Sequence, residues 1–335
     1  MSKLNHHTND SKKKNDIKLE KLVEWAIKNR IDENKIPRCK KELLSLTSLN
    51  LSYLGLTSLP KHIEALKNLE SLFIVGNKLT TLPLELFKLE KLEKLWFVEN
   101  YIREIPKEVN KLTNLKELVF GANYVTKLPD ISMLKNLEFI ALHDNCFTQE
   151  YIKNLNLKNI QYSSGYQKKQ LPFYIEPLSP KSLDETEKLR DKIFDDLSDD
   201  EKKILKASLD SKQNLNVYLV NGIKSASYWI VRDSKTLKII GLTGLYEELE
   251  DDENGCWLGW FCIDEKYRGK KYGIELLNFS IEKAKEMGKK VLNIYSYNVK
   301  KHHSAICMYK NNGFIEYEVK NTKYKRDLYF KKILF

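Results

Sequence analysis

The sequence predicts two domains in tandem, a curved solenoid of short parallel strands followed by an α+β domain with a mixed sheet. Two observations carry this prediction. Between residues 46 and 166 a pattern of leucines recurs at a fixed spacing, whereas from Phe173 onward strand-like and helix-like segments alternate without any repeat. A length of 335 residues and a hydrophobic fraction of 42% are sufficient for two separate cores.

The N-terminal residues are expected to form a tail and a cap. Residues 1–15 are polar and basic, with no apolar segment after their charges, so they predict a disordered tail rather than a secretory signal. Residues 16–45 contain the stretch IKLEKLVEWAIKNR, whose apolar residues fall on one helical face. Because the end of a repeat stack needs covering, this segment is the predicted N-terminal cap.

The leucine pattern between residues 46 and 166 is an internal repeat. Four segments align without gaps at a spacing of 23 residues, namely LTSLNLSYLGLTSLP, LESLFIVGNKLTTLP, LEKLWFVENYIREIP and LKELVFGANYVTKLP. A fifth copy, LEFIALHDNCFT, and a partial sixth, LKNIQYSSG, follow. Their asparagines, Asn77, Asn100, Asn123 and Asn145, can satisfy backbone groups where the chain turns off each strand.

These copies resemble the leucine-rich repeat family, of the short bacterial type. The resemblance implies an α/β leucine-rich repeat solenoid whose strands form a curved parallel sheet. Outward positions of the strands carry apolar side chains, with Phe73, Trp96 and Val119 in the central column and Phe139 in a flanking column. If these side chains stay uncovered, they predict a binding surface for a protein partner on the concave face. The alternative is that the second domain packs there.

Residues 167–335 are expected to form the α+β domain. The predicted helices are residues 182–197 and 199–210, with Ser182 and Ser198 as N-caps, and residues 272–288 and 304–313. The predicted strands are residues 216–222, 227–233, 238–248, 256–264, 291–298, 314–320 and 327–334. The order strand, basic glycine loop, helix, strand predicts one parallel crossover within an otherwise antiparallel sheet.

The run GWFCIDEKYRGKKYGIELL, followed by YSYN and SAICMYKNNGF, resembles the GNAT superfamily of acetyl-CoA-dependent N-acetyltransferases. The resemblance covers roughly residues 173 to 335 and implies that acetyl-CoA is the co-substrate. It assigns cofactor contacts to Phe261, Cys262, Ile263, Arg268, Gly269, Lys270, Lys271, Tyr272, Gly273, Ile274, Asn298, His302 and Ala305. Backbone N–H groups at a helix N-terminus favour a pyrophosphate, and glycines allow close approach. Lys271 and His302 depart from the family pattern, and a solvated basic loop is the alternative reading of this stretch.

Acetyl transfer needs a neutral amine, a polarised carbonyl and a proton for the leaving thiolate. The resemblance makes Tyr309 the candidate acid, with a buried core aromatic as the alternative. The strand at residues 256–263 contains no carboxylate, so Glu247 and Glu248 on the preceding strand are the candidate bases. Both begin the acidic run EELEDDE, which could equally be a solvated loop.

Composition and charge limit the partners. Residues 264–335 carry 17 basic and 8 acidic side chains, an excess that a phosphorylated cofactor explains as well as nucleic acid would, and no nucleic-acid motif is visible. Five scattered cysteines support neither a disulfide framework nor a zinc site, so we expect no metal and a cytoplasmic protein. No apolar run is long enough for a membrane span.

The sequence therefore predicts an N-acetyltransferase acting on an amine, with the repeats holding a protein or peptide substrate. One alternative is an acetyltransferase of small amines. The other is an interaction module whose GNAT domain is inactive or only senses acetyl-CoA.

Overall fold

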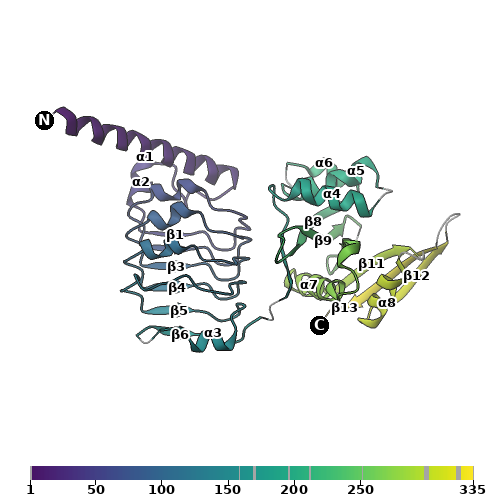
Figure 1. Ribbon diagram of the computed structural model, residues 1–335. Helices are drawn as coiled ribbons and strands as arrows, with labels where there is room; N and C mark the ends of the chain where they lie inside the picture. Colours follow the sequence, from purple (N-terminus) through teal and green to yellow (C-terminus); the bar gives the residue numbers. More distant parts are fainter. Residues whose placement is uncertain are drawn as a thin grey trace. The chain divides into compact units, whose positions relative to one another are not determined.

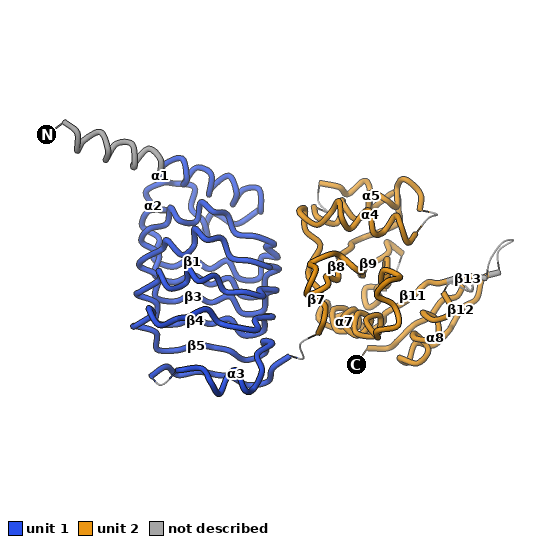
Figure 2. Tube along the Cα trace, in the orientation of Figure 1, with its two compact units in different colours: residues 1–170 blue, residues 171–335 orange. Residues whose placement is uncertain are grey.

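The computed structural model describes residues 2–157, 159–168, 171–194, 197–210, 213–250, 252–297, 302–321 and 326–334. The chain divides into two compact units, residues 1–170 and 171–335 (Figure 2).

The first unit begins with helix α1 (Ser2–Lys28), which is followed by α2 (Lys40–Ser45) (Figure 1). Leu19, Leu22 and Ala26 of α1 are buried in the same core as the repeats, as a covering helix requires. The helix begins well before residue 16, which differs from the disordered tail expected there. The first proline is Pro37 and the first glycine is Gly55, so neither residue type stops the helix at residue 16.

Six three-residue strands form one parallel sheet in chain order (Figure 1). They are β1 (Ser48–Asn50), β2 (Ser71–Phe73), β3 (Lys94–Trp96), β4 (Glu117–Val119), β5 (Phe139–Ala141) and β6 (Gln161–Ser163). The short helices between and after them are η1 (Lys61–Ala65), η2 (Leu84–Lys88), η3 (Lys107–Lys111) and α3 (Gln149–Lys153). Each strand pairs with its counterpart in the next copy of the leucine pattern, as Ser48 does with Ser71 and Ser71 with Lys94. The leucines of the pattern therefore stack into one continuous core.

The predicted role of the asparagines is confirmed. Asn100 lies buried, and its amide oxygen accepts a hydrogen bond from the backbone N–H of Leu79 at 3.0 Å. Its amide nitrogen donates to the carbonyl of Ile74 in the preceding copy at 2.9 Å. Asn77, Asn123 and Asn145 make equivalent bonds. These side chains thus link consecutive copies where the backbone leaves the strand.

The second unit contains seven strands and five α-helices among its described residues. The strands are β7 (Phe173–Pro177), β8 (Ile223–Asp233), β9 (Ile239–Glu248), β10 (Gly255–Ile263), β11 (Val291–Tyr297), β12 (Ile315–Asn321) and β13 (Arg326–Ile333). The helices are α4 (Leu183–Ile193), α5 (Asp199–Ser208), α6 (Leu215–Val220), α7 (Tyr272–Glu286), α8 (His303–Asn311) and the short η4 (Glu265–Tyr267).

These strands form a single mixed sheet in the order β12-β13-β11-β10-β9-β8-β7. Only β10 and β11 pair in parallel, joined by α7, so the predicted crossover is confirmed. Helices α7 and α8 share one core with the inner residues of β10, β11 and β13. On the other face α4 packs on β9, and α5 and α6 pack on β8.

The prediction of a strand at residues 216–222 is wrong, because α6 occupies Leu215–Val220. The segment NVYLVNG is rich in residues that favour strands, yet it packs its buried Tyr218 against α5 and β8. Its glycine, Gly222, adopts a positive φ of 67° and turns the chain into β8. The N-cap prediction holds fully for Ser198, which forms a reciprocal capping box with Glu201.

Candidate functional site

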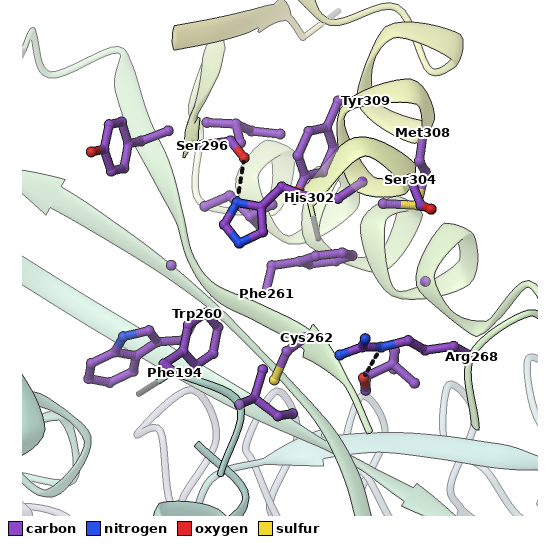
Figure 3. A pocket seen from close by; sticks show the side chains of 18 of the residues that line it. Phe194, Trp260, Phe261, Cys262, Arg268, Ser296, His302, Ser304, Met308 and Tyr309 are labelled. Atoms are coloured by element: carbon purple, nitrogen blue, oxygen red, sulfur yellow. Dashed lines mark hydrogen bonds between the residues drawn. The ribbon is translucent and has the colours of Figure 1, made fainter. Parts of the chain in front are cut away.

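The central feature of the second unit is the parting of strands β10 and β11. They pair only from Gly255 to Trp257 and from Val291 to Asn293. Strand β10 continues to Ile263 and β11 to Tyr297, so their C-terminal halves are no longer bonded to each other. A cleft of about 1560 Å³ opens there, lined by these strand ends and by helices α7 and α8 (Figure 3). On the other face of the sheet, residues of α4, α5, β8 and β9 also line it. Backbone groups of both strands can therefore pair with an extended ligand.

A β-bulge lies in the half of β10 that borders the cleft. The register between β10 and β9 shifts between Gly259 and Cys262, which leaves Trp260 and Phe261 outside the regular ladder. Trp260 has a φ of 37°, a value that side chains rarely adopt. Its ring stacks on Tyr228 with centroids 5.1 Å apart. This packing holds the turned backbone in place, and both residues of the bulge, Trp260 and Phe261, line the cleft.

Arg190 also packs against the bulge. This guanidinium is buried, lies 5.2 Å from the centroid of Trp260, and donates a hydrogen bond to the carbonyl of Lys202 at 2.8 Å. It also pairs with Asp191 at 2.8 Å. Arg190 thus links α4, on which it lies, to α5 through Lys202 and to β10 through Trp260.

The basic glycine loop follows β10 directly and ends at the start of α7. Arg268 donates from Nε to the carbonyl of Ile263 at 3.0 Å, which fixes the loop to the end of the strand (Figure 3). Gly269 has a φ of 78°, and no heavy atom lies within 4 Å of the place where a Cβ would stand. Lys271 is the N-cap of α7 and adopts the left-handed conformation with a φ of 64°. A lysine pays about 1 kcal/mol more than glycine for this conformation.

The structure brings most of the predicted cofactor residues into one cleft. Its lining includes Phe261, Cys262, Ile263, Arg268, Gly269, Lys271, Tyr272, Gly273, Ile274, His302 and Ala305. Lys270 does not line it, and its ammonium lies 5.2 Å from the ring centroid of Tyr267. Asn298 lies outside the described residues. The loop and the start of α7 form the cationic end of the cleft, which suits a phosphorylated ligand.

Comparison with protein families adds the deciding observation. Residues 190–314 match the acetyltransferase (GNAT) family. This part of the chain is a GNAT acetyltransferase domain. The protein is accordingly an acyltransferase.

Comparison with solved structures gives matches to each half of the chain. An acetyltransferase of the GNAT family from Staphylococcus aureus Mu50 is 20% identical, with 49% of this chain and 99% of that chain covered and a TM-score of 0.37. A spermidine N-acetyltransferase from Vibrio cholerae, in complex with CoA and spermine, is 15% identical over 49% and 96%, with a TM-score of 0.37. An LRR protein of Leptospira interrogans is 34% identical over 36% of this chain and 32% of its own, with a TM-score of 0.35. No curated protein matches the sequence.

Tyr309 of the acetyltransferase domain lies on α8 and lines the cleft (Figure 3). The side chain is buried among Phe261, Phe314 and Phe330, with ring centroids 6.1 to 6.2 Å away. Burial raises the pKa of Tyr309 well above the usual tyrosine value, and the nearby Cys262 adds to this effect. The hydroxyl therefore stays protonated at neutral pH and can donate a proton or a hydrogen bond into the cleft.

The two predicted bases lie in different surroundings. Glu247 pairs with Lys289 at 2.6 Å and accepts a hydrogen bond from Ser225 at 2.9 Å. Burial alone would raise the pKa of Glu247, but these two partners outweigh it and hold the pKa below the usual value. Glu247 is also absent from the lining of the cleft, whereas Glu248 belongs to it. Strand alternation explains the difference, because neighbouring residues point to opposite faces.

His302 also lines the cleft of the acetyltransferase domain, at the start of α8. Its Nδ1 lies 3.3 Å from the hydroxyl of Ser296 on β11 (Figure 3). This contact spans from α8 to one of the parted strands. Sequence reasoning did not single out Ser296, Tyr228 or Trp260, which all line the cleft. The glycines opposite Tyr228 were the available signal, since a Cβ at Gly244 would stand 2.2 Å from that ring.

In the first unit, the predicted partner-binding residues lie side by side on the parallel sheet. Phe73 and Trp96 make an edge-to-face contact at 5.1 Å, and the Trp96 indole donates to Glu117 at 3.0 Å. Phe139 is partly exposed, but Val119 is only 9% exposed. On the neighbouring strands Val119 lies between Trp96 and Ala141, and its low exposure means that it adds little to an exposed apolar patch.

Two kinds of feature are absent from the described part of the chain. No group of three or more His, Cys, Asp or Glu residues there could hold a metal ion. No helix there is long and apolar enough to cross a membrane.

Proposed function

We propose that the protein transfers the acetyl group of acetyl-CoA to an amine of a protein or peptide. The observation that carries this proposal is the parting of β10 and β11 directly before a loop with an open glycine, Gly269, and the start of α7. The loop and the start of α7 offer backbone donors to a diphosphate. The unpaired edges of β10 and β11 can form hydrogen bonds with the amides of a long arm. The donor groups present therefore fit acetyl-CoA.

Each chemical requirement of the transfer has a candidate group. Bound acetyl-CoA supplies the acetyl group as a thioester. Backbone N–H groups at the bulge of Trp260 and Phe261, which lie outside the β9–β10 ladder, are the candidate donors to the carbonyl oxygen as negative charge develops on it. Glu248 accepts the proton of the attacking amine, directly or through water, while Glu247 is held by Lys289. As the new C–N bond forms and the C–S bond breaks, Tyr309 donates its proton to the departing sulfur.

The first unit contributes a surface for the acceptor. We assign the six-strand parallel sheet to a leucine-rich repeat solenoid, with Phe73, Trp96 and Phe139 as the apolar part of its partner-binding face. Glu117 satisfies the Trp96 indole N–H and is itself paired with Lys94 at 2.7 Å. The charges beside these rings are therefore balanced, which suits an uncharged segment of a partner protein. All five cysteines are free, in keeping with the cytoplasmic location that we propose.

A thiol-release assay with acetyl-CoA and separate pools of proteins, peptides and polyamines tests this function. We expect turnover with the protein or peptide pool, and we expect Trp96→Ala to raise KM for a protein acceptor without changing kcat for a short peptide. Turnover with polyamines alone would favour the small-amine alternative. Acetyl-CoA binding without turnover on any pool would favour the sensing alternative.

A further inference from the structure

The two residues of the β10 bulge are anchored in different cores of the second unit. The Phe261 ring packs against the core that contains α7 and α8, and it lies 6.1 Å from the ring of Tyr309 (Figure 3). The Trp260 ring packs against the core formed by α4, α5, α6 and the facing residues of the sheet. The peptide group between Trp260 and Phe261 is therefore held from both faces of the sheet. Its N–H is one of the candidate donors to the thioester carbonyl.

The backbone of Trp260 needs support from its surroundings. Its φ of 37° lies in a region that residues with a Cβ rarely adopt, and such conformations persist only where neighbouring groups hold them. The two peptide planes that meet at Trp260 carry the N–H groups of Trp260 and Phe261. A return to negative φ would rotate these planes relative to each other and change the directions of both donors. The geometry of the candidate donors thus depends on the groups that hold Trp260.

Two side chains of known orientation contact the Trp260 ring. The Tyr228 ring stacks on it with centroids 5.1 Å apart, and the guanidinium carbon of Arg190 lies 5.2 Å from its centroid. A cation over an indole is attracted by the ring electrons, and the attraction is stronger where the cation is shielded from water. Arg190 is only 2% exposed, so its contact with Trp260 is of the stronger kind.

Hydrogen bonds fix the orientation of the Arg190 guanidinium. Its Nε donates to Oδ1 of Asp191 at 2.8 Å, and a terminal nitrogen donates to the carbonyl of Lys202 in α5 at 2.8 Å. The guanidinium is a rigid plane with donors in fixed directions, so these bonds also set the orientation of the group that contacts Trp260. A lysine ammonium has no such plane.

Stability alone does not account for a buried arginine at this position. Moving a charge out of water is costly, and apolar side chains of similar volume often replace buried ion pairs without loss of stability. The carboxylate partner, Asp191, is 46% exposed, which weakens the ion pair further. Arg190 is also absent from the lining of the cleft, so any effect that it has on the reaction passes through Trp260.

We propose that Arg190 is a positioning residue for acetyl transfer, which holds Trp260 at a positive φ and so directs the N–H groups of the bulge toward the thioester carbonyl. This inference rests on the proposed function and deepens it. It assigns the placement of the carbonyl donors to helices α4 and α5, which carry Arg190 and its hydrogen-bond acceptor Lys202.

Calorimetry of the full-length protein with acetyl-CoA and with S-ethyl-CoA tests the proposal without any acceptor. The two ligands differ at the carbonyl, so the ratio of their dissociation constants measures the hydrogen bonds to that oxygen. We expect wild type to prefer acetyl-CoA roughly fivefold, as one such hydrogen bond predicts. Arg190→Met should reduce this preference to less than about twofold and leave the affinity for S-ethyl-CoA within about twofold of wild type.

Arg232→Met is the matched control. Arg232 also ties α4 to the sheet, but its partners are Glu185 of α4 at 3.3 Å and Glu176 of β7 at 2.6 Å rather than the bulge. This variant should unfold at a lower urea concentration, as Arg190→Met does, and keep the preference for acetyl-CoA. Trp260→Gly provides a second test, because glycine adopts a positive φ without support. In that background Arg190→Met should change the preference by less than about twofold.

A preference for acetyl-CoA that persists in folded Arg190→Met would overturn the proposal, as would an equal loss of preference in Arg232→Met. A further large loss on adding Arg190→Met to Trp260→Gly would show that Arg190 does not act through the φ of residue 260. Equal affinity of wild type for both ligands would remove the bulge as a carbonyl donor and the proposal with it. The two proposals fail separately. An Arg190-dependent preference without transfer to any amine would refute acetyl transfer alone, whereas transfer with a preference independent of Arg190 would refute the positioning role alone.

Discussion

Replacing Tyr309 with phenylalanine removes the single oxygen that we assign as the proton donor to the leaving sulfur. A positioned general acid contributes about 10²–10³-fold to the rate, which corresponds to about 3–4 kcal/mol of activation free energy. We therefore expect kcat of Tyr309→Phe to fall by this factor, while the affinity for acetyl-CoA stays within about threefold of wild type.

The structure also predicts that this variant folds. The Tyr309 ring packs among Phe261, Phe314 and Phe330, and a phenylalanine ring fills the same space. Loss of the hydroxyl should change the free energy of unfolding by less than about 1 kcal/mol. Because burial raises the pKa of Tyr309, deprotonation of this group should not reduce the wild-type rate below about pH 10.

Steady-state kinetics, calorimetry with acetyl-CoA and urea unfolding together check this prediction. A kcat of Tyr309→Phe within about twofold of wild type would refute the assignment of the acid. A large loss of stability would instead show that the hydroxyl has a structural role.

Three further predictions concern stability. Lys271→Gly should raise the melting temperature by about 2–4 °C, since glycine adopts the φ of 64° at about 1 kcal/mol lower cost; an unchanged melting temperature would contradict this. Asn100→Ala should destabilise the first unit by roughly 2–4 kcal/mol in urea unfolding, because four hydrogen bonds to buried backbone groups are lost; a loss below that of an exposed substitution would refute the asparagine ladder. Burial raises the pKa of Glu64, but hydrogen bonds from Lys18 and Lys88 outweigh it and hold the pKa below the usual value. Because this pKa lies below the unfolded-state value near 4.5, the ionised Glu64 stabilises the fold above that pH, and the stabilisation is lost as the pH falls. The free energy of unfolding should therefore differ by about 1 kcal/mol between wild type and Glu64→Gln at pH 7, and the difference should shrink by pH 3. A difference that grows on acidification would show that the sign is wrong.

The structural features that could be predicted from the sequence are those with a periodic or a local signal. The spacing of 23 residues predicts the parallel pairing of Ser48 with Ser71. The hydrogen bonds of each asparagine are equally local, because their partners lie in its own copy of the repeat and in the copy before it. The capping box at Ser198 is likewise a local pattern. The segment at residues 216–222 was predicted wrongly, because packing of Tyr218 decides between helix and strand there and its partners are distant in the sequence.

The residues of the candidate site likewise include some that could be predicted from the sequence and some that could not. The loop from Arg268 to Gly273 is contiguous, so a turn with a positive φ at Lys271 could be anticipated from the sequence, whereas Lys270 does not line the cleft. That this loop binds the cofactor stays a prediction. The choice between Glu247 and Glu248 depends on strand alternation relative to a cleft that the sequence does not reveal. An aromatic cluster, formed by Tyr246, Trp257, Tyr295, Tyr317 and Tyr329, takes its rings from five strands, and only the sheet order β12-β13-β11-β10-β9 brings them together.

The central claim is that acetyl-CoA binds between the parted ends of β10 and β11. Hydrogen–deuterium exchange of the intact protein, with and without acetyl-CoA, tests it most directly. We predict slower exchange at residues 258–263 and 268–274, with no change at the strands of the first unit between residues 48 and 163. Unchanged exchange in the second unit at saturating acetyl-CoA, or protection confined to the repeats, would contradict the claim.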